Sequence, residues 1–163
     1  MSFLRFVRLL ALALWIGSIF FFAAVLAPTA FSVLPSRTLA GQMVSHSLFT
    51  LHWIGLACAM VFLLTCVLLA LFQGGQSMFY PRDLLLIAMM AITLVAHFGI
   101  ERKMETLRNN MGVIENVPRE DPRRVEFNRM HVWSERMEES VFLCGLVLFF
   151  LVVREPSARE RRY

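Results

Sequence analysis

The last apolar segment of the chain reads Val141-Phe142-Leu143-Cys144-Gly145-Leu146-Val147-Leu148-Phe149-Phe150-Leu151-Val152-Val153, and it directly follows the polar stretch His131-Val132-Trp133-Ser134-Glu135-Arg136-Met137-Glu138-Glu139-Ser140. The apolar run has 13 residues, whereas a helix needs about 20 to cross a bilayer. A helix that spans the membrane here must therefore draw on the polar stretch. Ionisable groups at that depth are costly unless they are paired or face a protein interior, so the rest of the chain must supply what they face.

The composition predicts a membrane protein. Of the 163 residues, 58% are hydrophobic, against about 45–50% in a soluble domain. We therefore expect one integral, multi-pass membrane domain over residues 1–163, in the inner or plasma membrane of a cell, with the lipid bilayer as its first partner. The net charge of +4 gathers at segment ends, as in membrane anchoring. Basic and aromatic residues do not alternate as they do in nucleic-acid-binding proteins, so nucleic acid is not an expected partner.

Four apolar segments predict an all-α fold, an up-down four-helix bundle with short links. The expected helices cover about residues 3–34, 38–72, 81–108 and 122–153, followed by a charged tail, 154–163. The stretch Gln73-Gly74-Gly75-Gln76-Ser77 is typical of a turn. Asp121 and Pro122 are typical of a helix start, and Gly112 of a helix stop.

The first two helices carry signals for bending and close packing. We expect Arg5 and Arg8 to mark the basic end of the first helix, and Pro28 to bend it. Small residues at Gly17, and at Gly55 with Ala59 four positions later, indicate where neighbouring helices come close.

Polar side chains are expected to converge at one end of such a bundle. His97, Glu101 and Glu105 form one stripe of the third helix, and His131, Glu135 and Glu138 form one stripe of the fourth, because each set recurs every three or four residues. Antiparallel packing places His97 near the level of Glu138, Glu101 near Glu135, and Glu105 near His131. His52 enters from the second helix at about the depth of His97.

Two interpretations of this polar end stay open. It forms either a site for a transition metal (Fe, Cu or Zn) or haem b, or a solvated rim of pairs such as Glu135 with Arg102. In the first case the haem ligands come from His52, His97 and His131. A metal ion would use the same histidines with Glu138, Glu101 and Glu135 as further ligands or as the groups that orient them.

Several short motifs resemble a known family, the transmembrane-protein-205-like group of small four-helix membrane proteins. They are Trp15-x-Gly17, Ala27-Pro28 with Phe31, Ala40-Gly41, His52, Leu107-Arg108-x-x-x-Gly112 and Phe127-x-x-x-His131-x-x-Ser134-x-x-x-Glu138. The chain is more distantly similar to membrane proteins of the copper resistance protein D and protoporphyrinogen oxidase J type. That similarity implies a haem- or metal-binding histidine early in the first helix, where this chain has Arg8.

We expect the polar end to bind a metal or haem for redox chemistry or metal handling. The alternatives are a non-catalytic subunit or assembly factor of a larger membrane complex, and a transporter or proton path, which would require a homo-oligomer. The sequence has no nucleophile triad and no glycine-rich phosphate loop, and it does not decide whether the protein is an enzyme. Basic residues divide almost evenly between the two ends of the bundle, and the basic tail slightly favours cytoplasmic termini.

Overall fold

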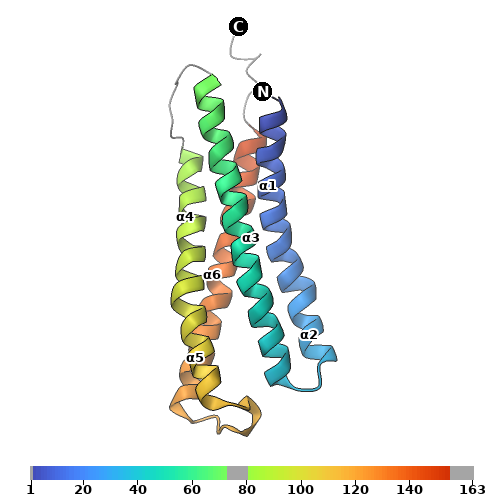
Figure 1. Cartoon of the computed structure of the whole chain (residues 1–163), viewed down its shortest axis with the longest axis vertical. Coiled ribbons are helices and arrows are strands. Elements are labelled where there is room, and N and C mark those ends of the chain that lie inside the picture. Colours follow the sequence, from blue (N-terminus) through green and yellow to red (C-terminus); the bar gives the residue numbers. More distant parts are fainter. Residues whose placement is uncertain (1, 73–80, 155–163) are drawn as a thin grey trace.

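The computed structural model describes residues 2–72 and 81–154, and within these ranges every regular element is a helix. The chain makes four antiparallel passes along the bundle (Figure 1). The elements are α1 (Ser2–Phe21), η1 (Phe22–Leu26) and α2 (Ala27–Val33) in the first pass; α3 (Arg37–Phe72) in the second; α4 (Pro81–Val95), η2 (Ala96–Glu101) and α5 (Arg102–Met111) in the third; and, after the short 3-10 turn η3 (Ile114–Asn116), α6 (Pro122–Val153) in the fourth. The predicted all-α membrane bundle is confirmed.

The links at the polar end are both described. Residues 34–36 and 112–121 lie at the same end of the bundle, opposite the start of α1 and the end of α6 (Figure 1). The predicted turn at Gln73–Ser77 and tail residues 155–163 lie outside the described residues.

Local sequence signals explain where the helices at this end begin and stop. Asp121 caps α6, because its side chain accepts a hydrogen bond from the backbone N–H of Arg123, 2.9 Å away. Pro122 takes the first helical position, where no N–H is needed. Gly112 ends α5 with φ +65°, a left-handed conformation that suits glycine. The third pass thus extends to Met111, past the predicted end at Arg108.

A π-helical turn accommodates Pro28 within the first pass. A proline has no N–H to donate to the carbonyl four residues earlier, which here belongs to Ala24 inside η1. In η1 the backbone widens, and the N–H of Ala27 reaches the carbonyl of Phe22, five residues back. The first pass therefore continues through the proline into α2, as π turns in long helices allow.

The core is built on a close contact between α1 and α3. Trp15 is fully buried, and a Cβ added at Gly55 would lie 2.7 Å from its Cε2 atom. Only a glycine lets the indole ring lie on the α3 backbone there. The predicted close approach at Gly55 is confirmed, but the one at Gly17 is wrong: Gly17 is exposed and a Cβ there would meet nothing within 4 Å.

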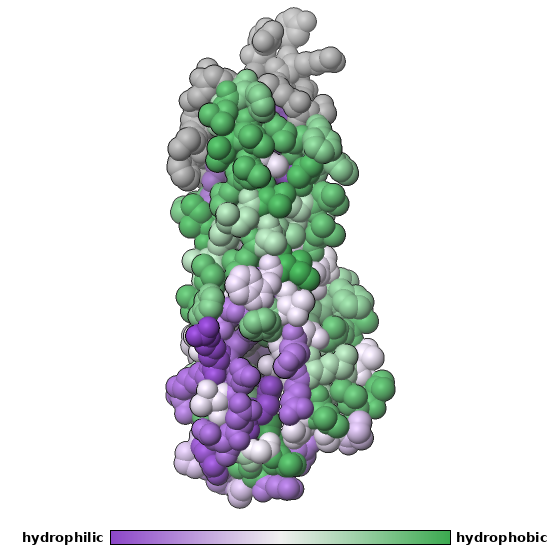
Figure 2. All heavy atoms as spheres, in the orientation of Figure 1, coloured by the Kyte–Doolittle hydropathy of each residue, from purple (hydrophilic) through white to green (hydrophobic). Residues whose placement is uncertain are grey.

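Three segments are long and apolar enough to cross a membrane: Phe3–Val33, Arg37–Phe72 and Arg82–Met111. The last helix, α6, is not one of them, because Arg136, Glu138 and Glu139 interrupt its lower half. Glu139 is exposed, so the hydrocarbon region lies on the Val153 side of it. In Figure 2 the surface over α5 is hydrophilic, whereas the surface over α2 beside it and the opposite half of the molecule are largely hydrophobic.

A hydrogen-bonded contact joins the last loop to the start of α3. The backbone N–H of Thr38 donates to Oε1 of Glu115 at 3.0 Å, and the Thr38 hydroxyl donates to Oε2 of the same carboxylate. The N–H of Ile114 in turn donates to the Thr38 hydroxyl at 3.3 Å. Glu115 therefore satisfies a backbone donor in the first turn of α3, which would otherwise have no helical partner.

We predict that Gly55→Ala destabilises the bundle by about 1–3 kcal/mol, because the added methyl group forces Trp15 or the α3 backbone to move. Thermal unfolding in mild detergent measures the effect, with Gly17→Ala as the matched control. Equal stability of the two variants would contradict the packing of Trp15 on Gly55.

The Glu115 contact predicts a pH dependence at the start of α3. Hydrogen bonds from Thr38 lower the pKa of Glu115 from 4.5 to about 2. Because the folded-state pKa is the lower one, the stabilisation is complete above about 4.5 and is lost as the pH falls toward about 2. Hydrogen exchange of the Thr38 amide, corrected for the intrinsic rate, should show protection that declines over this range. Glu115→Gln should lose this dependence; an identical decline in the variant would disprove the role of the carboxylate.

Candidate functional site

Three passes of the chain bring two histidines and two carboxylates together at the membrane boundary. His52 comes from α3, His97 and Glu101 from the π turn η2, and Glu138 from α6. The rings of His52 and His97 are 1% and 4% exposed, and their centroids lie 5.6 Å apart. The predicted common depth of these histidines is confirmed.

The contacts form a continuous chain. Nδ1 of His97 lies 3.3 Å from Oε2 of Glu101, and Oε1 of Glu101 lies 3.2 Å from Nδ1 of His52. On the other side of the His52 ring, Nε2 lies 2.5 Å from Oε1 of Glu138. Each of the two ring nitrogens of His52 thus contacts a carboxylate from a different pass of the chain.

The π turn positions two of these side chains. Residues Ala96–Glu101 form η2. A π turn widens the helix because its hydrogen bonds reach five residues back, and such turns are frequent at functional sites. His97 and Glu101 stand four residues apart and still contact each other, while both reach His52 on α3. The turn contains Gly99 but no proline, and a single glycine within an apolar helix does not predict a π turn.

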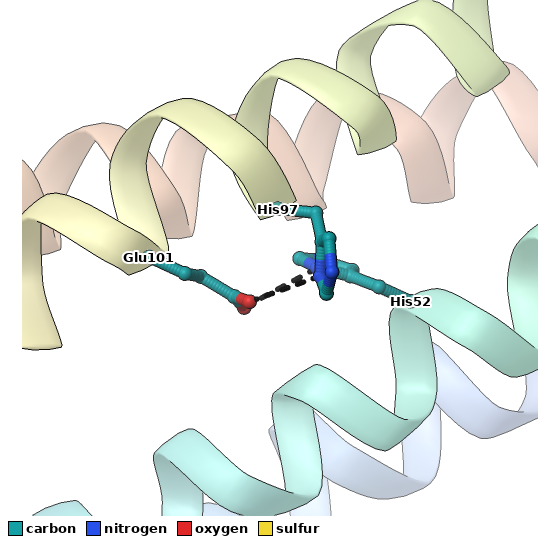
Figure 3. Close-up of side chains that lie close together, drawn as sticks. All are labelled: His52, His97 and Glu101. Carbon is teal, nitrogen blue, oxygen red and sulfur yellow. Dashed lines mark ion pairs between the residues drawn. The ribbon is translucent and has the colours of Figure 1, made fainter.

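Three polar atoms of this cluster are buried without a hydrogen-bond partner in the described part of the chain: Nδ1 of His52, Nδ1 of His97 and Oε1 of Glu101. They lie near one another, as Figure 3 shows, but without the angles of a hydrogen bond. One ligand atom from each residue can be chosen so that all three lie within 4.8 Å of one another. Buried polar groups are normally satisfied. Two imidazole nitrogens and a carboxylate oxygen that converge without being satisfied are the donors that a divalent transition metal takes.

Aromatic side chains enclose the His97 ring. Phe49 and Phe98 lie with ring centroids 4.7 Å from that of His97, and Trp53 lies at 5.5 Å. This wall lowers the local polarity and fixes the orientation of the imidazole ring.

The remaining predicted site residues lie elsewhere. His131 and Glu135 form a separate pair on α6, with Nε2 and Oε1 3.2 Å apart, and both side chains are about half exposed. Glu105 is exposed on α5. Glu101 contacts His52 and His97. Arg102, predicted to pair with Glu135, lies instead over the Phe98 ring, 5.0 Å from its centroid.

Arg8 lies near the predicted basic end of the first helix, but it is buried there. Its side chain is 2% exposed and its guanidinium lies 5.6 Å from the centroid of the Phe62 ring. Asp83 at the same end of the bundle is also buried. The available signal is that Arg8 falls one turn inside an apolar segment, where ionisable groups are costly unless they face protein.

The family comparison covers the part of the chain that contains most of this cluster. The model for the domain of unknown function DUF4149 matches residues 10–112, well over half of the chain. The chain belongs to the DUF4149 family. The match contains His52, His97 and Glu101, whereas Glu138 and the whole of α6 lie beyond it. Neither a curated protein nor a solved structure matches the chain.

Proposed function

We propose that this DUF4149 protein binds one divalent transition-metal ion, Fe²⁺ or Zn²⁺, through His52, His97 and Glu101 at the membrane boundary, and that it serves metal handling or redox chemistry there. The observation that carries the proposal is the convergence of buried ligand atoms from these residues, with nitrogen–oxygen distances of 3.2 and 3.3 Å but without hydrogen bonds between them. A set of two histidines and one carboxylate is used by non-haem iron and by catalytic zinc sites, and it leaves coordination positions open.

The donor set argues against two other cofactors. Copper(I) prefers thiolate and thioether ligands, and the group of converging ligand atoms contains no sulfur. Haem needs a flat cavity, but Phe49, Phe98 and Trp53 pack around His97. The predicted similarity to copper resistance protein D and protoporphyrinogen oxidase J would place a histidine in the first helix, where Arg8 stands. The proposed ion therefore uses the second and third passes instead.

Glu138 has a different role from Glu101 in this proposal. Its carboxylate contacts Nε2 of His52, whereas the carboxylate of Glu101 contacts Nδ1. When a metal binds Nδ1, the Nε2–H donates to Glu138, which fixes the ring and strengthens it as a ligand. Glu138 is thus a positioning residue.

Metal content of the purified protein tests the site. After loading with Zn²⁺, or with Fe²⁺ under anaerobic conditions, and removal of free ion, elemental analysis should find about one ion per chain. His97→Ala should weaken binding by at least about tenfold, because it removes a ligand. His131→Ala is the matched control and should retain the ion, since His131 lies on the exposed face of α6.

Two outcomes would overturn the metal site: a metal-free protein after loading, or equal loss in His97→Ala and His131→Ala. A Soret band in the absorption spectrum would indicate that the site binds haem instead of a single metal ion. A metal-free and colourless protein would favour a proton path, for which the unbroken contacts from His97 through Glu101 and His52 to Glu138 are the supporting observation.

The role of Glu138 has its own test. We expect Glu138→Gln to weaken metal affinity by about 10–100-fold with unchanged stoichiometry, as loss of an orienting carboxylate does. When the Glu138→Gln variant is loaded with Co²⁺, the visible absorption bands of the Co²⁺ ion should shift, but without the change in intensity that follows loss of a ligand. Glu135→Gln is the control, because that carboxylate pairs with His131. Identical affinities for the two variants would remove Glu138 from the site.

A further inference from the structure

An exposed stripe runs along the first half of α3, on the outside of the bundle. It consists of Leu39, Gln42, His46, Phe49 and Trp53, here called the α3 seam, and all five side chains are exposed. Leu39, Phe49 and Trp53 are each about half exposed, as is the neighbouring Met43. The hydrophobic surface over α2 and the start of α3 contrasts with the hydrophilic surface over α5 and α6 (Figure 2).

The lower part of this seam lies outside the hydrocarbon region. His52 contacts Glu138, so these two residues share one level, and Glu139 next to it on α6 is exposed. The residues of α3 before His52 extend from that level toward the charged loops (Figure 1). Arg37–Phe72 has 36 residues, more than the roughly 20 that cross a bilayer, so the start of α3 can extend beyond the hydrocarbon region. A contiguous exposed apolar surface in such a polar zone marks a protein interface.

The spacing of the seam fits a parallel helix. Its members are separated by three, four, three and four residues, an average of 3.5, which is the repeat of a left-handed coiled coil. The same repeat continues into the membrane-spanning half of α3 at Leu56, Met60, Leu63 and Val67. A single straight seam thus crosses from the polar region into the bilayer.

We infer that the α3 seam binds the α3 seam of a second copy of this chain, forming a parallel homodimer. Two copies in one membrane stand the same way up, so a twofold axis along the membrane normal pairs identical helix faces in parallel. Every residue on the axis then meets its own copy. The seam suits this, because it contains no Asp, Glu, Lys or Arg and so avoids like-charge contacts.

The polar members of the seam are self-complementary. An amide such as that of Gln42 both donates and accepts hydrogen bonds, and a neutral imidazole such as that of His46 does the same. Each can therefore satisfy its own copy, and a polar residue in a coiled-coil seam sets register and oligomeric state. A hollow of about 410 Å³, lined by Leu34, Leu39, Gln42, Met43 and His46, lies beside the seam and can take a side chain from the partner helix.

The dimer would also enclose the histidine cluster. Phe49 and Trp53 pack against His97 on one side and belong to the seam on the other. Pairing would bury these two aromatic rings and close the outer wall of the cluster. The inference does not depend on a metal ion, and the two proposals can fail separately.

Disulfide cross-linking in native membranes tests the dimer. In a full-length protein with Cys58, Cys66 and Cys144 replaced by alanine, His46→Cys and Met60→Cys should cross-link on mild oxidation to a band of twice 18.7 kDa. Ile54→Cys and Val61→Cys are the controls: both are exposed on α3 but lie one residue past seam positions, about 100° around the helix, and should stay monomeric.

A charge substitution gives an independent measurement. His46→Lys would place two ammonium groups against each other on the axis, so size-exclusion chromatography with light scattering should shift from dimer to monomer. Asn128→Lys, exposed on α6, should remain dimeric. In the cross-linking experiment, absence of a cross-link at residues 46 and 60 would indicate that lipid covers the seam. A cross-linked band of another mass would indicate that a different protein binds there. Equal cross-linking at all four positions would indicate random collision. Each of these results would overturn the homodimer.

Discussion

The contact of His52 with Glu101 on one side and Glu138 on the other is the interaction on which the rest of the polar end depends. It joins α3, η2 and α6 at one level. Isolated charges at this depth would be costly, but here each carboxylate meets an imidazole, and the imidazole meets both. The cluster can therefore be buried at the membrane boundary, and it determines which faces of the three helices turn toward each other.

The same cluster sets the position of the membrane along the bundle. The apolar half of α6 is short, so the hydrocarbon region must lie close to Glu138 and Glu139. The candidate membrane spans of the three other passes are much longer than this apolar half and extend past this level. Their lower ends carry the Glu115–Thr38 contact, which holds the last loop on α3, and the exposed face of α3. A bundle with unequal apolar lengths thus acquires a polar compartment on one side of the membrane.

The two π turns have different causes, one in the local sequence and one in the tertiary contacts. In η1, the wider turn accommodates the missing N–H of Pro28. In η2, no proline is present, and the wider turn contains His97 and Glu101. A distortion of the backbone has an energetic cost, and packing of His97 among aromatic rings and the contacts to His52 compensate for it. The first turn follows from local sequence, whereas the second follows from what surrounds it.

The sequence by itself determined the all-α class, the membrane environment, the caps at Asp121 and Gly112, and the shared depth of His52 and His97. These follow from hydrophobic runs, helix-end chemistry and helical periodicity, all of which are local properties. Only the tertiary structure decided that His52 lies between Glu101 and Glu138, that the His131–Glu135 pair stays outside this cluster, and that Arg8 is buried. These depend on the rotation of each helix about its axis, which is set by Trp15 packing on Gly55 and by the π turn at η2, and such contacts between distant segments leave no periodic signal in the chain.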